Sequence, residues 1–251
     1  MISYNKNTLK QIFLTVIIYL FLNHKLIISN FILSMKRKAF VPDPDELINP
    51  VYFKTENRVT KFREVISRRQ NDLHLILEDV FDPHNVSAVL RTCDSVGVGE
   101  VHLVYVEEEF PVFNKKSSSG TWKWIKSSKY DTIESCFKKL KNAGVKIYTT
   151  DLNENSKSIY DVDFTVPIAI VFGNEHKGVS RTANELSDGN INIPMNGLVE
   201  SLNISVACAV TLYEVFRQRD LKEMYKNNKS NEEIERTLKE WLFRTSKIKI
   251  L

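Results

Sequence analysis

Residues that could hold a reacting group gather in three short polar stretches, each of which follows an expected strand. The first contains Asn85 and Arg91, the second contains Glu175, and the third contains Ser201 and Asn203. An arginine in such a place can grip a phosphate and stabilise an oxygen that becomes negative during a reaction. Because ligands of an open α/β sheet bind beyond the carboxyl ends of its strands, the three stretches are consistent with one shared site.

The sequence contains none of the signatures of several other chemistries. It has no glycine-rich dinucleotide fingerprint, no P-loop, no HExxH pair and no cysteine cluster. Hydride transfer, P-loop phosphoryl transfer and structural zinc therefore have no support, and no metal is expected. The three cysteines, Cys93, Cys136 and Cys208, are far apart and are expected to be buried thiols in a reducing compartment, which favours the cytoplasm.

Each of these polar residues also has an ordinary structural interpretation. On a helical wheel Arg91 falls opposite the apolar arc, which predicts a solvent-facing polar stripe. The stripe also contains Ser87, Asp94 and Ser95. Asn85 would be the N-cap of the same helix. Glu175 would be a loop carboxylate, and Ser201 and Asn203 would begin the next helix.

From residue 73 onward, expected strands alternate with expected helices. Strands are expected at 73–80, 101–106, 145–152, 167–173 and 190–195, and helices at 85–96, 132–144, 180–188 and 201–219. The run 167–173 is apolar throughout, which is typical of a strand that is buried on both faces. This alternation predicts an α/β fold with a parallel sheet.

The chain of 251 residues carries a formal charge of +4, which suits an anionic partner without requiring one. Residues 1–34 are unusually apolar. Three interpretations stay open: a start codon assigned too early, an extension that contacts a membrane, or a signal peptide without a recognisable cleavage site. Membrane contact is expected only if residues 12–33 are real and inserted. Residues 41–51 contain three prolines and are expected to form a linker.

The expected helices near the two ends of the chain have apolar stripes. The first, at 56–70, has its stripe at Val59, Phe62, Val65 and Ile66, and its basic remainder is either a solvated face or a phosphate-contacting arm. In the tail, a capping-box pattern runs from Ser230 to Glu233. A stripe follows it at Ile234, Leu238, Trp241 and Leu242. The tail helix is therefore expected to dock on another surface.

The expected helix at 201–219 is apolar around nearly its whole circumference. A helix of this kind must be buried on every side. One face is expected to meet the sheet and another to meet a second subunit, which predicts a homodimer.

Extended to their neighbours, the three polar stretches read HNVSAVLRTCDSVGVGEVHLV, IVFGNEHKGVS and IPMNGLVESLNISVACAVTLYEVFRQR. In this order and at this spacing they resemble the three motifs of the SpoU/TrmH family of RNA ribose 2′-O-methyltransferases, over about residues 55–220. The resemblance implies an α/β parallel-sheet SPOUT (α/β knot) fold with a C-terminal trefoil knot, which general topology rules would exclude. Helical extensions are expected at both ends. The expected parts are an apolar extension (1–34), a linker and basic helical arm (35–70), a methyltransferase domain (71–219) and a helical tail (220–251).

The resemblance implies a role for each polar residue of the three stretches. Arg91 matches the arginine at the catalytic centre, and Asn85 matches the asparagine that helps to position it. Glu175 matches an acid that shapes the same pocket, and Ser201 and Asn203 match the polar pair of the third motif. The implied methyl donor is S-adenosyl-L-methionine. It would be enclosed, largely by backbone and apolar groups, at Thr150, Gly173, Ile193, Met195 and Leu202.

The implied reaction is methylation of a ribose 2′-hydroxyl in tRNA, and one branch is favoured, that of the D-loop guanosine at tRNA position 18. The segments SSSGTWKWIKSSKYDTIESC and REVISRRQNDLHLILEDV resemble this branch. The alternatives are a ribosomal RNA methyltransferase of the same fold and a non-catalytic RNA-binding homologue. Expected tRNA contacts are Arg58, Lys61, Arg63, Arg68, Arg69, Lys123, Lys126 and Lys129, near Trp122 and Trp124, which either stack on bases or pack in the core. The family is homodimeric, in agreement with the apolar helix at 201–219.

A guanidinium is a poor base because it stays protonated in proteins. We therefore expect Arg91 mainly to grip the neighbouring phosphate and to stabilise the developing oxyanion. Removal of the hydroxyl proton by a transiently neutral Arg91 stays the alternative.

Overall fold

The computed structural model describes residues 55–107, 121–153, 155–226 and 229–245. The chain divides into two units, Met1–Tyr52 and Phe53–Leu251, and every described residue belongs to the second. The expected apolar extension (1–34) and the expected linker (41–51) both lie outside the described residues. None of the described helices is long and apolar enough to cross a bilayer.

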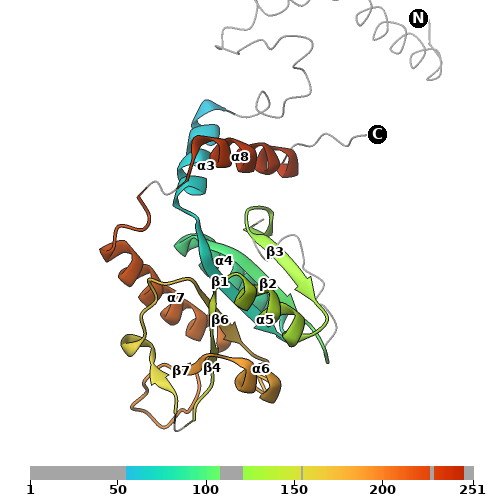
Figure 1. Cartoon of the computed structure of the whole chain (residues 1–251), viewed down its shortest axis with the longest axis vertical. Helices are drawn as coiled ribbons and strands as arrows, with labels where there is room; N and C mark the ends of the chain where they lie inside the picture. Colours follow the sequence, from blue (N-terminus) through green and yellow to red (C-terminus); the bar gives the residue numbers. More distant parts are fainter. Residues whose placement is uncertain (1–54, 108–120, 154, 227–228, 246–251) are drawn as a thin grey trace, which may run out of the picture. The chain divides into compact units, whose positions relative to one another are not determined.

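The described strands form one seven-stranded sheet in the order β3-β2-β1-β6-β4-β7-β5, and all of the pairings are parallel (Figure 1). The strands are β1 (Gln70–Glu78), β2 (Val98–Val104), β3 (Lys126–Tyr130), β4 (Lys146–Thr150), β5 (Lys157–Ser158), β6 (Ile168–Phe172) and β7 (Gly189–Asn192). Strand β6 is buried along its whole length, as its continuous apolar run predicts. The prediction of a parallel α/β sheet is confirmed, and the trefoil knot stays a prediction.

Helices cover both faces of the sheet. The helices are α3 (Glu56–Arg68), α4 (Pro83–Val96), α5 (Ile133–Asn142), α6 (Arg181–Leu186), α7 (Ile204–Leu221) and α8 (Asn231–Thr245), with short 3-10 turns η3 (Thr121–Lys123) and η4 (Ile159–Asp161). Helices α4 and α7 pack on one face, where Leu75 belongs to the same apolar cluster as Cys93 and Leu212. Helices α5 and α6 pack on the other face, around Ile76 and Phe137. The three cysteines are buried free thiols, as expected.

The residues that cap the helices explain where each helix begins and ends. Ser180 caps α6 by accepting a 3.0 Å hydrogen bond from the N–H of Ala183, as expected. Gly144, at φ 75°, ends α5 in the left-handed conformation that glycine adopts without strain. The expectation for Asn85 was wrong, because Asp82 caps α4 and accepts a 2.8 Å hydrogen bond from the N–H of His84. This leaves the amide of Asn85 available for the loops.

Helix α7 is only partly covered by its own chain. It begins at Ile204, three residues later than expected, and Asn203 is its N-cap. Its inner face is in the core, but Val206 and Tyr213 are 47% and 54% exposed. The expectation that the helix is buried on every side is therefore not met within one chain, and an apolar outer face is left open.

Helix α8 docks on α3, as its apolar stripe predicts (Figure 1). The Trp241 ring lies 5.7 Å from the ring of Phe62 and 5.3 Å from that of Trp124, measured between centroids. The core-packing interpretation therefore holds for Trp124, whereas Trp122 is exposed. The capping box is formed on one side only: Ser230 accepts from the N–H of Glu233 at 3.2 Å, but the Glu233 carboxylate bonds Asn71 and Lys229 instead.

Candidate active site

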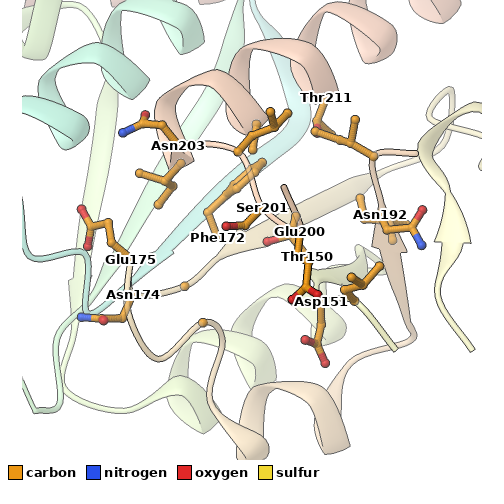
Figure 2. Close-up of a pocket in the computed structure, with 18 of the residues that line it drawn as sticks. Thr150, Asp151, Phe172, Asn174, Glu175, Asn192, Glu200, Ser201, Asn203 and Thr211 are labelled. Carbon is orange, nitrogen blue, oxygen red and sulfur yellow. The ribbon is translucent and has the colours of Figure 1, made fainter. Parts of the chain in front are cut away.

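The carboxyl ends of four neighbouring strands, β1, β6, β4 and β7, bring the three polar stretches to one edge of the sheet. A cavity of about 600 Å³ lies there, which is within the range of small-molecule sites. Its walls are the ends of β4 and β6, the loop 173–178, the loop 193–203 and the inner side of α7. Figure 2 shows Glu175 and Asn203 toward one end of this lining and Asn192 toward the other.

The structure brings together all of the positions that were expected to enclose the methyl donor. Thr150, Gly173, Ile193, Met195 and Leu202 all line the cavity. The Thr150 hydroxyl donates a 2.8 Å hydrogen bond to the carbonyl of Val171, which ties the ends of β4 and β6 together. Three separate segments of the chain thus meet around one volume.

Glu175 is the centre of a hydrogen-bond network at the mouth of the cavity. Its carboxylate accepts from the backbone N–H of Phe81 at 3.0 Å and of Asp82 at 3.2 Å, and from the Asn85 side chain at 2.9 Å. Burial by itself would raise the pKa of Glu175, but these hydrogen bonds outweigh that effect and hold the pKa below its ordinary value. The carboxylate is therefore ionised at neutral pH and holds the first loop to the second.

Asn85 extends this network to the third loop. The Asn203 side-chain amide donates to the Asn85 carbonyl oxygen at 3.2 Å. The Asn203 oxygen in turn accepts from the Ser205 N–H at 2.9 Å, which caps α7. The chain Glu175–Asn85–Asn203 thus connects all three stretches through side chains. Ser201 lies in the cavity wall and is labelled in Figure 2.

Arg91 lies on the exposed side of α4, as the helical wheel predicts. It does not line the cavity, and no hydrogen bond or ion pair to it occurs among the described residues. Ser95 shares its exposed side, but Ser87 was wrongly placed there: it is buried, because α4 is covered by α7 as well as by the sheet. A guanidinium that no described residue engages is available to a substrate outside the cavity.

The loop 173–178 owes its shape to a tight backbone closure. Asn174 and Gly178 exchange hydrogen bonds between their backbones at 2.8 and 2.9 Å, and the Asn174 side chain accepts from the N–H groups of His176 and Lys177. Gly173 packs directly against this closure. A Cβ atom at Gly173 would lie 2.2 Å from the carbonyl group of Gly178.

Replacement of Gly173 by alanine is therefore expected to open the loop and to weaken binding of S-adenosyl-L-methionine at least ~10-fold, since a backbone clash must be relieved by moving the cavity wall. Isothermal titration of the variant with this compound measures the loss. Gly197→Ala is the matched control, because a Cβ there meets nothing nearer than 4.0 Å and should leave the affinity unchanged. Equal affinities for both variants would contradict the placement of the ligand against this loop.

Several cavity residues were not predicted from the sequence. Asp151, Asn192, Glu200 and Thr211 also line the cavity (Figure 2). Thr211 is fully buried, and its hydroxyl has no hydrogen-bond partner among the described residues. A single hydroxyl in an otherwise apolar stretch of helix was the signal that could have identified it, because buried polar groups normally have partners.

These residues fit the methyl donor that the sequence implied. Thr211 adds a buried hydroxyl, without a partner among the described residues, to the helix that lines the cavity. The carboxylates of Asp151, Glu175 and Glu200 suit a ligand with a sulfonium and an ammonium group, because unlike charges attract strongly in a partly enclosed site. Apolar side chains such as Ile159 and Leu202 complete a wall of mixed polarity.

The expected tRNA contacts do not form one uniform surface. Lys123 is half-buried, and the exposed members are Arg58, Lys61, Arg63, Arg68, Lys126 and Lys129. Arg63 is held by a bidentate contact to Glu235, and Lys126 by Glu100 at 2.7 Å. Arg69 was wrongly included: it is buried, paired with Asp94 and placed over the Trp241 ring, so it joins α3 to the domain instead of facing solvent.

Comparisons with known proteins agree with this architecture. The model of the SpoU rRNA Methylase family matches residues 72–213. A tRNA (guanosine(18)-2′-O)-methyltransferase of Thermus thermophilus is 44% identical over 190 residues, which cover 75% of this chain and 97% of the relative. The enzyme of the same name from Escherichia coli is 40% identical over 168 residues, covering 67% and 73%.

Solved structures show the same likeness. The crystal structure of the A. aeolicus TrmH/SpoU tRNA modifying enzyme superposes with a TM-score of 0.71 and 40% identity, covering 75% of this chain and 96% of that one. The SpoU methyltransferase AviRb from Streptomyces viridochromogenes, in complex with the cofactor AdoMet, has a TM-score of 0.55 and 26% identity, covering 61% and 59%. With the three motifs folded around one cavity, these matches show that the chain belongs to the SpoU methylase family.

Proposed function

We propose that this protein transfers a methyl group from S-adenosyl-L-methionine to the ribose 2′-hydroxyl of the D-loop guanosine at tRNA position 18. The observation that carries the proposal is the side-chain network Glu175–Asn85–Asn203 at the mouth of a cavity that contains every expected donor-binding position. Relatives at 39–44% identity that bear the name tRNA (guanosine(18)-2′-O)-methyltransferase support the choice of substrate.

The positions of the side chains indicate which of them bind the donor and which act on the RNA. When bound, S-adenosyl-L-methionine supplies a methyl group on a positively charged sulfur. The ribose oxygen would take the methyl carbon as the sulfur–carbon bond breaks, the demethylated donor would leave as a neutral thioether, and the hydroxyl proton would pass to solvent. Holding the oxygen in line with the methyl group supplies much of the acceleration, because the donor is intrinsically reactive.

Arg91 is placed to act on the RNA side of this reaction. It is exposed and unengaged among the described residues, about one and a half helical turns from Asn85, which belongs to the network at the cavity mouth. We assign to it the grip on the phosphate next to the reacting ribose and stabilisation of the developing oxyanion. Glu175 holds Asn85, and with it the start of α4, in the orientation that brings Arg91 to the substrate.

tRNA binding is assigned to the exposed basic residues of α3 and of the segment 122–129, so the affinity for tRNA should fall steeply with salt.

Arg68 has no ion pair among the described residues, so its replacement tests this assignment most directly. Arg68→Gln is expected to weaken tRNA binding and to lower the slope of log K against log salt by about 1. Filter binding over a salt series measures this. Lys157→Gln, on edge strand β5 at the other end of the sheet, should leave the slope unchanged, and a salt-independent affinity would rule out the assigned surface.

The outer face of α7 supports assembly as a homodimer. Val206 and Tyr213 are exposed there, and Val210 and Phe216 are half-buried. An apolar face that its own chain does not cover is typical of a subunit interface. We also expect the family's trefoil knot in the C-terminal segment. A cytoplasmic location is proposed for the protein, in agreement with three free buried thiols.

Mapping of the methylated nucleotide tests the proposed reaction. The purified protein is incubated with methyl-labelled donor and either unmodified tRNA or ribosomal RNA, and the product is located by mass spectrometry of nuclease fragments. A single 2′-O-methylguanosine in the tRNA D-loop is the expected result. Methylation of ribosomal RNA alone would select the alternative substrate, and binding of tRNA without donor binding or turnover would identify a non-catalytic homologue.

A further inference from the structure

A second cluster of polar side chains lies on the sheet face that α5 covers, and none of its members lines the cavity described above. His74 on β1 pairs in register with Glu100 on β2, and His102 lies two residues further along β2. Alternate residues of a strand point to the same face, so the three side chains converge. Their nitrogen and carboxylate oxygen atoms all lie within 4.8 Å of one another, and the described part of the chain contains no second group of this kind.

The distance between the two imidazoles is close to the one that a shared metal ion requires. His74 Nδ1 and His102 Nε2 are 3.1 Å apart. Two nitrogens bound tetrahedrally to Zn²⁺ at about 2.0–2.1 Å lie roughly 3.3 Å from each other. The two rings would therefore have to move only slightly to exchange their direct hydrogen bond for joint coordination of one metal ion.

The three groups are already in the protonation states that a metal needs. Burial lowers the pKa of His74 and lowers that of His102 to about 4, so both rings are neutral at neutral pH. Burial would raise the pKa of Glu100, but hydrogen bonds from Lys126 and Ser128 outweigh it and keep the carboxylate ionised. Metal ligands must be deprotonated to bind, and these three meet that condition before any ion arrives.

An ion could reach this cluster and would have one competitor there. Of the three ligands, Glu100 lines a cavity of about 480 Å³, together with Asn71, Gly99 and Lys126. The Lys126 ammonium lies 2.7 Å from the Glu100 carboxylate, but its side chain is 69% exposed and can turn into solvent. Lys139, the other nearby cation, is held by the Tyr130 hydroxyl at 2.9 Å.

We propose that His74, Glu100 and His102 form a Zn²⁺ site, with water as the fourth ligand. Two imidazoles and one carboxylate are a ligand set that zinc favours in four-coordinate sites. The bound ion would join β1 to β2 on the face opposite α4, and it takes no part in the proposed methyl transfer. It strengthens the pairing of the two strands that lead into and out of the helix carrying Arg91.

Titration of the full chain, without a polyhistidine tag and after treatment with a chelator, tests the site. Calorimetry with Zn²⁺ should show one ion per chain, and Co²⁺ should give the visible absorption of a tetrahedral complex. His74→Gln and Glu100→Gln should each weaken Zn²⁺ binding more than ~100-fold, which exceeds the effect of losing an outer hydrogen-bond partner. Zn²⁺ should raise the thermal midpoint of the parent protein and leave that of His74→Gln unchanged.

Two further variants separate this site from general affinity for metals. His84→Gln changes an exposed histidine elsewhere and should bind Zn²⁺ like the parent. Lys126→Gln removes the competing cation and should bind Zn²⁺ several-fold more tightly. Circular dichroism confirms that each variant is folded. Absence of saturable binding by the parent, undiminished binding by His74→Gln, or weaker binding by Lys126→Gln would each overturn the assignment and leave a hydrogen-bonded histidine pair only.

Discussion

Replacement of Arg91 by alanine is expected to lower kcat for tRNA methylation by about 10²–10³-fold, the loss that follows removal of one charge-stabilising donor from an active site. The affinity for S-adenosyl-L-methionine should change less than ~2-fold, because Arg91 does not line the cavity. Single-turnover methylation with saturating donor gives the rate, and calorimetry gives the affinity. A variant that loses donor binding to the same degree as turnover would contradict the assignment of Arg91 to the RNA side.

Arg91→Lys distinguishes the two chemical roles of this residue. Lysine keeps the positive charge but lacks the planar fork of donors, so a gripping and stabilising role predicts a rate well below that of the parent. Lysine also gives up its proton more readily than arginine, with an ordinary pKa near ~10.4, so a proton-removing role predicts a rate that is kept or raised. Ser95→Ala, one turn along the same exposed side of α4, should keep the parent rate and serves as the control.

Replacement of Arg219 by alanine is expected to cost about 2–5 kcal/mol of unfolding free energy, the range seen when a large buried side chain is cut back to alanine. Arg219 is completely buried near the end of α7. It donates to the carbonyls of Phe164 and Val166, both at 2.9 Å, and to Asp72 at 2.6 Å. Alanine would leave these acceptors without their donor and would open a cavity between α7 and the start of β1.

Urea unfolding at a fixed protein concentration measures this loss of unfolding free energy. Two other variants of α7 show whether the loss is specific to the buried contacts of Arg219. Arg219→Lys should lose less, because an ammonium still reaches some of the acceptors. Arg217→Ala removes an exposed arginine two residues earlier. Its partner Glu214 is buried but keeps the 2.8 Å hydrogen bond from Gln218, so the cost should stay below that of Arg219→Ala. If Arg217→Ala and Arg219→Ala were equally stable, the buried contacts of Arg219 would not support the fold in the way described.

The sequence predicted the central strands well and the edge strands poorly, for a physical reason. Strand β6 lies in the middle of the sheet and is buried on both faces, so its apolar run is unmistakable. Strand β3 has the sequence KSSKY and lies at one edge, where its side chains are exposed or half-buried and carry no apolar alternation. Strand β5, with two residues, is too short to give a periodic signal.

Within the site, periodicity gave the direction of each side chain but not its partner. The exposed direction of Arg91 was correct. The interpretation of Asn85 as a cap failed because Asp82, three residues earlier, takes that role, and Asn85 then bonds to Glu175, ninety residues along the chain. Contacts between residues so far apart in the sequence depend on the order of strands in the sheet, and a local sequence pattern does not reveal that order. The burial of Arg69 was missed for the same reason, since its partner Asp94 is on another helix.

The position of helix α7 has a consequence for ligand binding at a distance. One side of it presents Ala207 and Thr211 to the cavity, while Val206 and Tyr213 face outward from the same turns. A ligand that shifts or stiffens this helix changes the affinity of its outer side for a binding partner. A partner bound to the outer side then changes the affinity of the cavity for its ligand by the same factor. If two copies associate through the outer face, as proposed above, this association and occupancy of the cavity are thermodynamically linked. The midpoint of the donor-binding curve should then depend on protein concentration.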